Sequence, residues 1–202
     1  LPPSGILKLE KVRLRDNAPA DSISIIKNQK KKDKNLTAGV SYLSLIKTHE
    51  DLTDFDSNMK VKPILRSSKD RKALQKGLTD GTLDYISSNH VPLEIEKKHL
   101  EYPYVSHGAI GLETTFAALN SHVMQSIDLT TIIEKMTIGP RSVFNIPSPS
   151  IAVGESAKIT IFDPTYEWKY EEQLIKSTSC NSPFVGETFT GKVIATLNGG
   201  KV

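Results

Sequence analysis

The sequence predicts an α/β fold with parallel strands, followed by a small β unit. Two observations support this prediction. Segments typical of strands and helices alternate over residues 1–145, and strand and turn patterns follow a proline-rich linker at 145–150. Three strands of the parallel kind cannot close a barrel, because a complete (β/α)8 barrel needs roughly 250 residues. We therefore expect two domains, residues 1–145 and residues 146–202.

The first strand and helix are expected near the start of the chain. Residues 12–16 alternate in polarity, which is typical of a short strand. Pro19–Ser22 then opens a helix, because proline and acidic residues favour a first helical turn. Five lysines lie between Lys27 and Lys34. They could form an anion site or a solvated helix end whose cations suit the helix dipole, and we favour the second interpretation.

A second strand and helix follow. Leu36–Ile46 is mostly apolar and rich in residues that favour strands, so we expect a buried strand that continues into a loop. Ser68 can cap a helix that runs through Gly77, and Asp80-Gly81 is a typical helix end. This pair repeats the strand-then-helix order that a parallel sheet requires.

The third strand is expected at Leu83–Ser88, and the polar segment Asn89–Pro92 follows its carboxyl end. Leu112–Val123 and Leu129–Met136 have helical periodicity. Polar residues directly after a parallel strand are candidates for a functional site, because such sites collect at the carboxyl ends of the strands.

The tail predicts antiparallel structure. Residues 157–162 alternate and end at Asp163-Pro164, and residues 191–197 run into an Asn-Gly turn signal. So few strands are not stable alone, and we expect them to complete a sheet whose other strands lie elsewhere in the parent chain.

Composition excludes several classes of protein. A net charge of +3 over 202 residues is too small to suggest nucleic-acid binding, and no apolar run is long enough for a membrane span. A single cysteine, Cys180, excludes an internal disulfide and a cysteine-based zinc site, and it fits a reduced, cytoplasmic setting. Cys180 has no histidine nearby and is expected to be a bystander thiol. The first residue is Leu and no targeting signal follows, so we expect a chain that begins inside a longer protein.

Four groups of motifs run in order through the chain. They are LTDFD with KVKPILR at 52–66, DRKAL with DGTLD at 70–84, GAIGLET at 108–114, and IFDP, PFVG and GKV between 161 and 193. They resemble DLxDFDxNYKVNPPLR, DRxALxxGLxDGTID, GxxGLET and IFDP…TPFxGxxxxGKV of the dihydroorotases of the longer bacterial type, in the amidohydrolase superfamily. The resemblance spans nearly the whole chain but only about half of such an enzyme.

The resemblance implies a fold and a reaction. The family fold is a (β/α)8 barrel with a small β domain, so residues 1–145 would be the C-terminal part of the barrel and 146–202 part of the β domain. The family reaction is the reversible ring closure of carbamoyl aspartate to dihydroorotate, a cyclic-amide reaction of pyrimidine biosynthesis. Zinc activates a water, and an Asp at the end of the last strand moves the proton.

The positions that carry this chemistry differ here. Asp16 stands where the family has a zinc-binding His, and Ser41-Tyr42-Leu43-Ser44 replaces the TPHH motif. Asn89 replaces the Asp that binds metal and moves the proton. An amide has no charge and cannot act as a base near neutral pH. We therefore expect no bound zinc, although Asp16 could serve as a ligand.

The substrate-binding positions differ as well. Lys62 replaces the Asn of the NPPLR motif, and Leu93 replaces a His that contacts substrate. His107 stands where the family often has Phe, and only Gly108 matches.

Matched scaffold positions and unmatched chemical positions are typical of a homologue that has lost catalysis. The first hypothesis is therefore an inactive structural or interaction partner, with aspartate transcarbamoylase or a second copy as the binding partner. The second hypothesis is an active zinc-dependent hydrolase with an altered metal site. It needs Asp16 as a ligand and a new base in place of Asn89, for which His90 is the nearest candidate.

Overall fold

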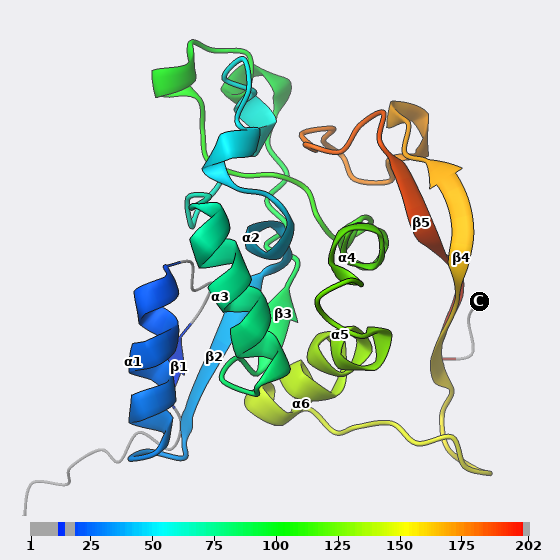
Figure 1. Cartoon of the computed structure of the whole chain (residues 1–202). Coiled ribbons are helices and arrows are strands. Elements are labelled where there is room, and N and C mark those ends of the chain that lie inside the picture. The colour runs from blue at the N-terminus through cyan, green and yellow to red at the C-terminus, as the bar shows by residue number, and fades with distance from the viewer. Residues whose placement is uncertain (1–11, 15–18, 200–202) are drawn as a thin grey trace, which may run out of the picture.

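The computed structural model describes residues 12–14 and 19–199 and shows a three-stranded parallel sheet covered by helices (Figure 1). The strands are β1 (Val12–Leu14), β2 (Leu36–Ser41) and β3 (Tyr85–Ser87), in the order β1-β2-β3. Both pairs are parallel. Helices α1 (Ala20–Lys30) and α3 (Ser68–Thr79) lie in the two crossovers between them. The predicted order of strands and helices is confirmed.

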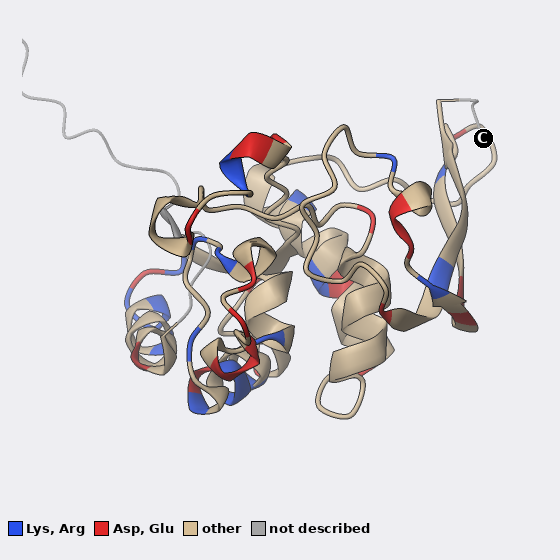
Figure 2. Ribbon diagram, turned by 90° about the horizontal axis from the view of Figure 1, so that it is seen from above, with Lys and Arg blue, Asp and Glu red and all other residues tan. Residues whose placement is uncertain are grey.

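The lysine-rich end of α1 pairs with carboxylates of the neighbouring segment. Lys27 Nζ lies 2.5 Å from Asp80, and Lys30 Nζ lies 2.6 Å from Asp84. Figure 2 shows blue Lys and Arg segments and red Asp and Glu segments interspersed over the ribbon. This arrangement supports a solvated helix end over an anion site.

The segment after β2 differs from the prediction. The strand ends at Ser41, and Tyr42–Ile46 forms helix α2 instead of a longer strand that runs into a loop. All five residues of α2 are buried. A short segment that is buried on every side has no polar face, so its sequence pattern cannot distinguish a strand from a helix.

Helix α3 begins with a capping box. The cap is Ser67, one residue before the predicted Ser68. The Ser67 hydroxyl accepts a hydrogen bond from the Asp70 backbone N–H at 3.3 Å, and the Asp70 carboxylate accepts one from the Ser67 N–H at 3.2 Å. Asp70 also accepts from the Ala20 N–H at 2.7 Å, at the start of α1. The hydrogen bonds from Ser67 and Ala20 lower the pKa of Asp70. One carboxylate therefore joins the N-termini of two helices.

Three further helices follow β3: α4 (Thr115–Val123), α5 (Leu129–Met136) and α6 (Ile138–Phe144). Helix α5 has the predicted bounds, and α4 begins three residues later than Leu112. Helix α6 was not predicted, because Gly139 and Pro140 in its first turn are typical helix breakers. Gly139 is needed there, since a Cβ atom at this position would lie 2.2 Å from the Asp84 carbonyl oxygen.

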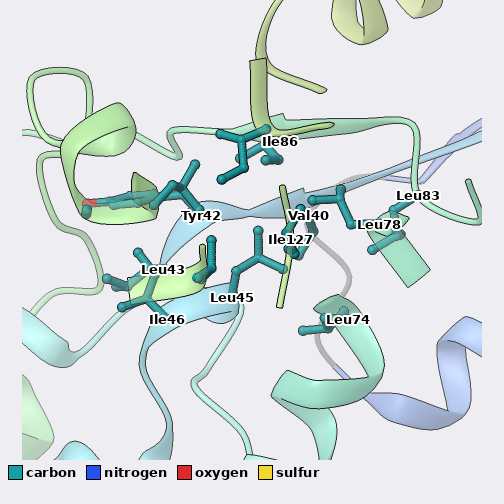
Figure 3. Close-up of a cluster of buried hydrophobic side chains, with 14 of the residues drawn as sticks. Val40, Tyr42, Leu43, Leu45, Ile46, Leu74, Leu78, Leu83, Ile86 and Ile127 are labelled. Carbon is teal, nitrogen blue, oxygen red and sulfur yellow. The ribbon is translucent and has the colours of Figure 1, made fainter. Parts of the chain in front are cut away.

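The core lies between the sheet and the helices, and Figure 3 shows part of it. Ala38 and Val40 of β2 and Leu78 of α3 are fully buried. The tail contributes to the same core through Phe184 and Phe189, which are also fully buried. The tail thus packs on the α/β part, and the proposed division at residue 145 stays a prediction.

The tail strands are longer than predicted. β4 (Lys158–Lys169) and β5 (Thr188–Asn198) form an antiparallel pair. β4 does not end at Asp163-Pro164, because a register shift between Asp163 and Glu167 accommodates Pro164. A bulge tolerates proline, which has no N–H for the ladder.

Polar contacts also hold the tail on the helices. His122 Nε2 of α4 lies 2.5 Å from Glu187, and Lys47 lies 3.7 Å from the other oxygen of the same carboxylate. Burial alone would raise the pKa of Glu187, but His122 and Lys47 together lower it. Asn120 donates to the carbonyl oxygens of Pro164 and Thr190 at 2.9 and 2.8 Å.

Short 3-10 helices occupy the connecting loops. They are His49–Asp51, Ser57–Met59, Ile95–Lys97, Tyr102–Tyr104 and Glu172–Leu174. Among the described residues, no helix is long and apolar enough to cross a membrane.

Candidate functional site

The candidate site lies at the carboxyl ends of β2 and β3. Two long loops rise from this end of the sheet, one over residues 47–67 and one over residues 88–111 (Figure 1). The backbone N–H of Gly108 donates to the Lys60 carbonyl at 2.9 Å, so the loops contact each other. Functional residues of parallel α/β folds collect at this end of the strands.

Asn89 forms two hydrogen bonds, one to the end of β3 and one to the loop that contains Lys62. Its side-chain amide donates to the Lys62 carbonyl at 2.7 Å, and its backbone N–H donates to the Ser87 hydroxyl at 3.1 Å. Its φ of 43° lies in the left-handed region, which Asn tolerates better than most residues. An ionised carboxylate could not donate the bond to Lys62, so this contact depends on the amide.

His90 has a structural role in this geometry. Its Nδ1 accepts from the backbone N–H groups of Gly111 at 3.1 Å and Leu112 at 3.3 Å. An imidazole nitrogen that accepts hydrogen bonds carries no proton, so the Nε2 atom of the neutral ring holds it. The accepting lone pair is thus already occupied, and His90 is poorly placed to act as a general base.

The end of β2 presents hydroxyl groups. Ser41 and Ser44 are buried, with 3 % and 6 % of their surface exposed. The Tyr42 hydroxyl lies 3.4 Å from both the Ile110 carbonyl and the Thr114 hydroxyl. Burial raises the pKa of Tyr42, so the phenol stays neutral. Neutral hydroxyl groups of this kind are not typical ligands of zinc.

The neighbouring side chains leave no room for a side chain at Gly108. A Cβ atom there would lie 2.7 Å from Val91 Cγ1 and 3.0 Å from Leu93 Cδ1. Its φ of 154° is also unfavourable for other residues. The geometry therefore brings Leu93 against Gly108, as two of the substrate-binding positions that the family resemblance implies.

His107 lies half-buried in a positive environment. Burial lowers the pKa of His107, and the ammonium groups of Lys62, Lys60 and Lys98 lower it further. His107 and Lys62 are thus near neighbours of Asn89 and Gly108 at the mouth of the fold. Asp16 lies outside the described residues.

Asn181 of the tail is part of the site and was not predicted. Only 5 % of its surface is exposed. Its side chain accepts from the Leu93 N–H at 3.1 Å and donates to the carbonyl oxygens of Val91 and Gly108 at 3.0 and 3.2 Å. Its own carbonyl accepts from the Ile110 N–H at 3.0 Å. It lies in a polar loop, where no local pattern marks it out.

Cys180 is exposed and unpaired. Partial burial and the nearby carboxylates of Glu172 and Glu113 raise the pKa of the thiol. A thiol with a raised pKa is a poor nucleophile at neutral pH. The geometry therefore supports the prediction of a bystander.

The donor groups that the structure describes at the mouth do not fit zinc. Within the part of the chain that the structure describes, no three His, Cys, Asp or Glu side chains are placed to hold a metal ion. Asn89, Ser41 and Ser44 offer an amide and hydroxyls, whereas zinc takes thiolate, imidazole or carboxylate ligands.

The fold and this site define a piece of a parallel α/β barrel with its functional residues at the carboxyl ends of the strands. The amidohydrolase family model matches residues 14–202, and the chain belongs to this family. Among curated relatives, the dihydroorotase of Syntrophus aciditrophicus (strain SB) is 35 % identical over 184 residues, which cover 91 % of this chain and 43 % of the relative. The dihydroorotase of Bacillus subtilis (strain 168) is 36 % identical over 184 residues, with coverage of 90 % and 43 %.

Solved structures show the same fold. The L-hydantoinase (dihydropyrimidinase) from Arthrobacter aurescens has a TM-score of 0.87 at 24 % identity, covering 95 % of this chain and 44 % of that one. An inactive dihydroorotase-like domain of the Chaetomium thermophilum CAD-like multifunctional protein has a TM-score of 0.70 at 17 % identity, covering 95 % and 50 %. The prediction of a partial amidohydrolase barrel is confirmed. The chain spans less than half the length of the curated relatives it matches.

Proposed function

We propose that this chain is part of a dihydroorotase-family protein that has lost hydrolysis of cyclic amides and acts as a structural or interaction partner. The observation that carries the proposal is Asn89. The family resemblance assigns it the position of the proton-carrying Asp, and its amide donates to the Lys62 carbonyl. An amide cannot exchange a proton near neutral pH, and loss of a general acid–base group lowers a rate by about 10²–10⁴-fold.

Two further observations support loss of turnover. His90, the nearest candidate for a replacement base, accepts backbone hydrogen bonds through Nδ1. Ser41 and Ser44 belong to the segment that stands where the family has the TPHH motif, and both are buried. An inactive dihydroorotase-like domain with a related fold provides a precedent for the fold without the activity.

The proposed partner is aspartate transcarbamoylase or a second copy of the protein. The resemblance to the family suggests aspartate transcarbamoylase, since inactive members of the family are expected to act by binding partners through their surfaces. The sheet supports the second, because among the described strands β1 and β3 each pair with β2 alone, and the outer strands of a sheet favour association with another chain.

Turnover by the full-length protein tests the proposal. Hydrolysis of dihydroorotate is measured with added zinc, and the Bacillus subtilis dihydroorotase is assayed in parallel as the active control. We expect no hydrolysis above the uncatalysed rate. A rate within about 100-fold of the control would contradict the proposal. If Asp16→Ala then removed both this hydrolysis and the bound zinc, the protein would be an active enzyme with an altered metal site. Asp16→Asn serves as the milder variant, because it removes only the charge.

A further inference from the structure

An open groove of about 640 Å³ lies between helices α3 and α4. Its floor is formed by Leu45 and Ile46 of α2, which are 0 % and 6 % exposed. Its walls are polar side chains of α3 and of the end of α4. No residue of the candidate site at the mouth lines this groove, so the two are separate features of the surface.

The groove is bounded by elements of this chain on both sides. Helix α3 packs on α1 and α2, and α4 packs on α2 and β5. In Figure 1, α3 accordingly lies between α1 and α4. Further strands of a barrel would be added beside β1 and β3, the outer strands of the sheet, and not between these two helices.

Three cationic side chains of α3 line one wall: Arg71, Lys72 and Lys76. Lys72 and Lys76 are exposed and lie four residues apart, so they share one face of the helix. Among the described residues, no carboxylate lies within 4.0 Å of the charged nitrogens of these three side chains. Arg71 donates to the Ile46 carbonyl at 2.9 Å, and its other N–H groups remain for a ligand.

The opposite wall carries no negative charge. It consists of His122 of α4 and of Gln125 and Ser126, which follow this helix. No Asp or Glu side chain lines the groove. The cations of α3 therefore give the groove a positive potential.

Two nearby carboxylates are already engaged outside the groove. Glu187 pairs with His122 Nε2. Asp51 accepts from the backbone N–H and the hydroxyl of Thr48 at 2.6 and 2.7 Å. Burial acts to raise the pKa of Asp51, but these hydrogen bonds and nearby cations, including Arg71, lower it. Neither carboxylate lines the groove, so neither fills it with negative charge.

We propose that this groove docks an acidic segment of a partner protein, whose Glu or Asp side chains pair with Arg71, Lys72 and Lys76. Charge complementarity supports this occupant, because cations one helical turn apart match carboxylates that lie four residues apart on a partner helix. A nucleic acid is less well matched, since the cations are few and the net charge of the chain is only +3. The proposal rests on the interaction role proposed above and names the chemistry of the partner.

A peptide titration of the full-length protein tests the proposal by fluorescence anisotropy. The probe is a labelled alanine-based helical peptide with Glu at every fourth position, and the same peptide with Gln at these positions is the neutral control. We expect saturable binding of the Glu peptide that weakens as salt is added, and at least about fivefold weaker binding of the Gln peptide. A DNA duplex is the third probe. Equal affinities for the two peptides would overturn the proposal, as would tighter binding of the duplex than of the Glu peptide.

Variants locate the binding surface. Lys72→Glu and Lys76→Glu should each weaken binding of the Glu peptide by about three- to tenfold, because an attraction becomes a repulsion at an exposed position. Lys72→Arg keeps the charge and should retain the affinity. Lys31→Glu makes the same change of charge at the exposed end of α1, outside the groove, and should leave the affinity unchanged. Equal affinities across all variants, or an equal loss in Lys31→Glu, would overturn the proposal.

Hydrolysis of dihydroorotate is measured separately, so the two proposals can fail independently. Turnover by a protein that still binds the Glu peptide through Lys72 and Lys76 would count against the proposed loss of catalysis. Absence of peptide binding in a protein without turnover would count against the groove alone.

Discussion

The side-chain amide of Asn89 donates a hydrogen bond to the backbone carbonyl of Lys62 over 2.7 Å. The contact joins the end of the third strand to the loop that follows α2. The family resemblance assigns Asn89 to the position of a proton-carrying Asp, and in this structure its amide links the end of β3 to the loop that contains Lys62. Under the proposed function, the same residue type that cannot move a proton provides a local structural contact.

Asn89→Asp should destabilise the protein. The carboxylate would face the Lys62 carbonyl without a donor, and loss of this exposed hydrogen bond should lower the free energy of unfolding by about 0.5–1.5 kcal/mol. Urea unfolding at pH 7 measures this change. The control is Asn35→Asp, an exposed position, where we expect a change within about 0.5 kcal/mol. Equal unfolding midpoints for Asn89→Asp and the unmodified protein would contradict the structural role of the amide.

Gly108→Ala should destabilise the loops at the mouth. The new methyl group would lie 2.7 Å from Val91, and overpacking of this kind costs about 1–3 kcal/mol. Gly154→Ala separates crowding from backbone strain, because Gly154 has a φ of 92° but a Cβ atom there would have no neighbour within 4 Å. Thermal unfolding should give a larger loss for Gly108→Ala. A loss no larger than that of Gly154→Ala would count against the close packing described for Gly108.

Asn181→Ala should loosen the tail from the mouth. It leaves the Leu93 N–H and the carbonyl oxygens of Val91 and Gly108 without their partner, and unsatisfied buried groups cost about 1–3 kcal/mol each. Hydrogen exchange should become faster at the Leu93 N–H. Asn28→Ala, on the exposed side of α1, should leave that exchange rate unchanged. Unaltered protection of the Leu93 N–H in Asn181→Ala would refute the role of the tail.

Asp70→Ala should lower stability at neutral pH, by about 1–2 kcal/mol, through loss of the helix cap and of the acceptor for Ala20. The pKa of Asp70 is lower in the folded state, so its charged form stabilises the fold above the ordinary Asp pKa. That contribution is lost as the pH falls through the lowered value.

The gap in stability between the unmodified protein and Asp70→Ala should therefore shrink between about pH 5 and pH 2. Urea unfolding over this range checks the dependence on pH. Asp21→Ala, in the exposed first turn of α1, is the control for loss of a carboxylate at a helix start. A gap that stays constant with pH would show that the charge of Asp70 contributes nothing.

Local patterns predicted the elements that have clear ends. The alternation of strands with helices gave the parallel sheet, and α5 has the expected bounds because its apolar residues repeat with helical spacing. Helix α2 was missed because it is buried on every side. Pro164 suggested an early end for β4, but a bulge removes the need for its N–H.

The candidate site was only partly predictable. The resemblance assigned Lys62, Asn89 and Gly108 to site positions of the family, which implied that they lie near one another. It gave no indication of Asn181, whose partners lie up to 90 residues away in the sequence. Contacts over such separations depend on how the tail packs, which no local pattern contains. Lys98 was missed because its burial arises from the loop conformation around it.

Native mass spectrometry of the full-length protein, purified with zinc in the medium, tests the central claim most directly. It reports the mass of the chain, its bound metal and its oligomeric state together. The proposed loss of acid–base and ligand groups at the mouth predicts a chain without stoichiometric zinc. One or two zinc ions per chain would contradict the account and would assign a ligand role to Asp16.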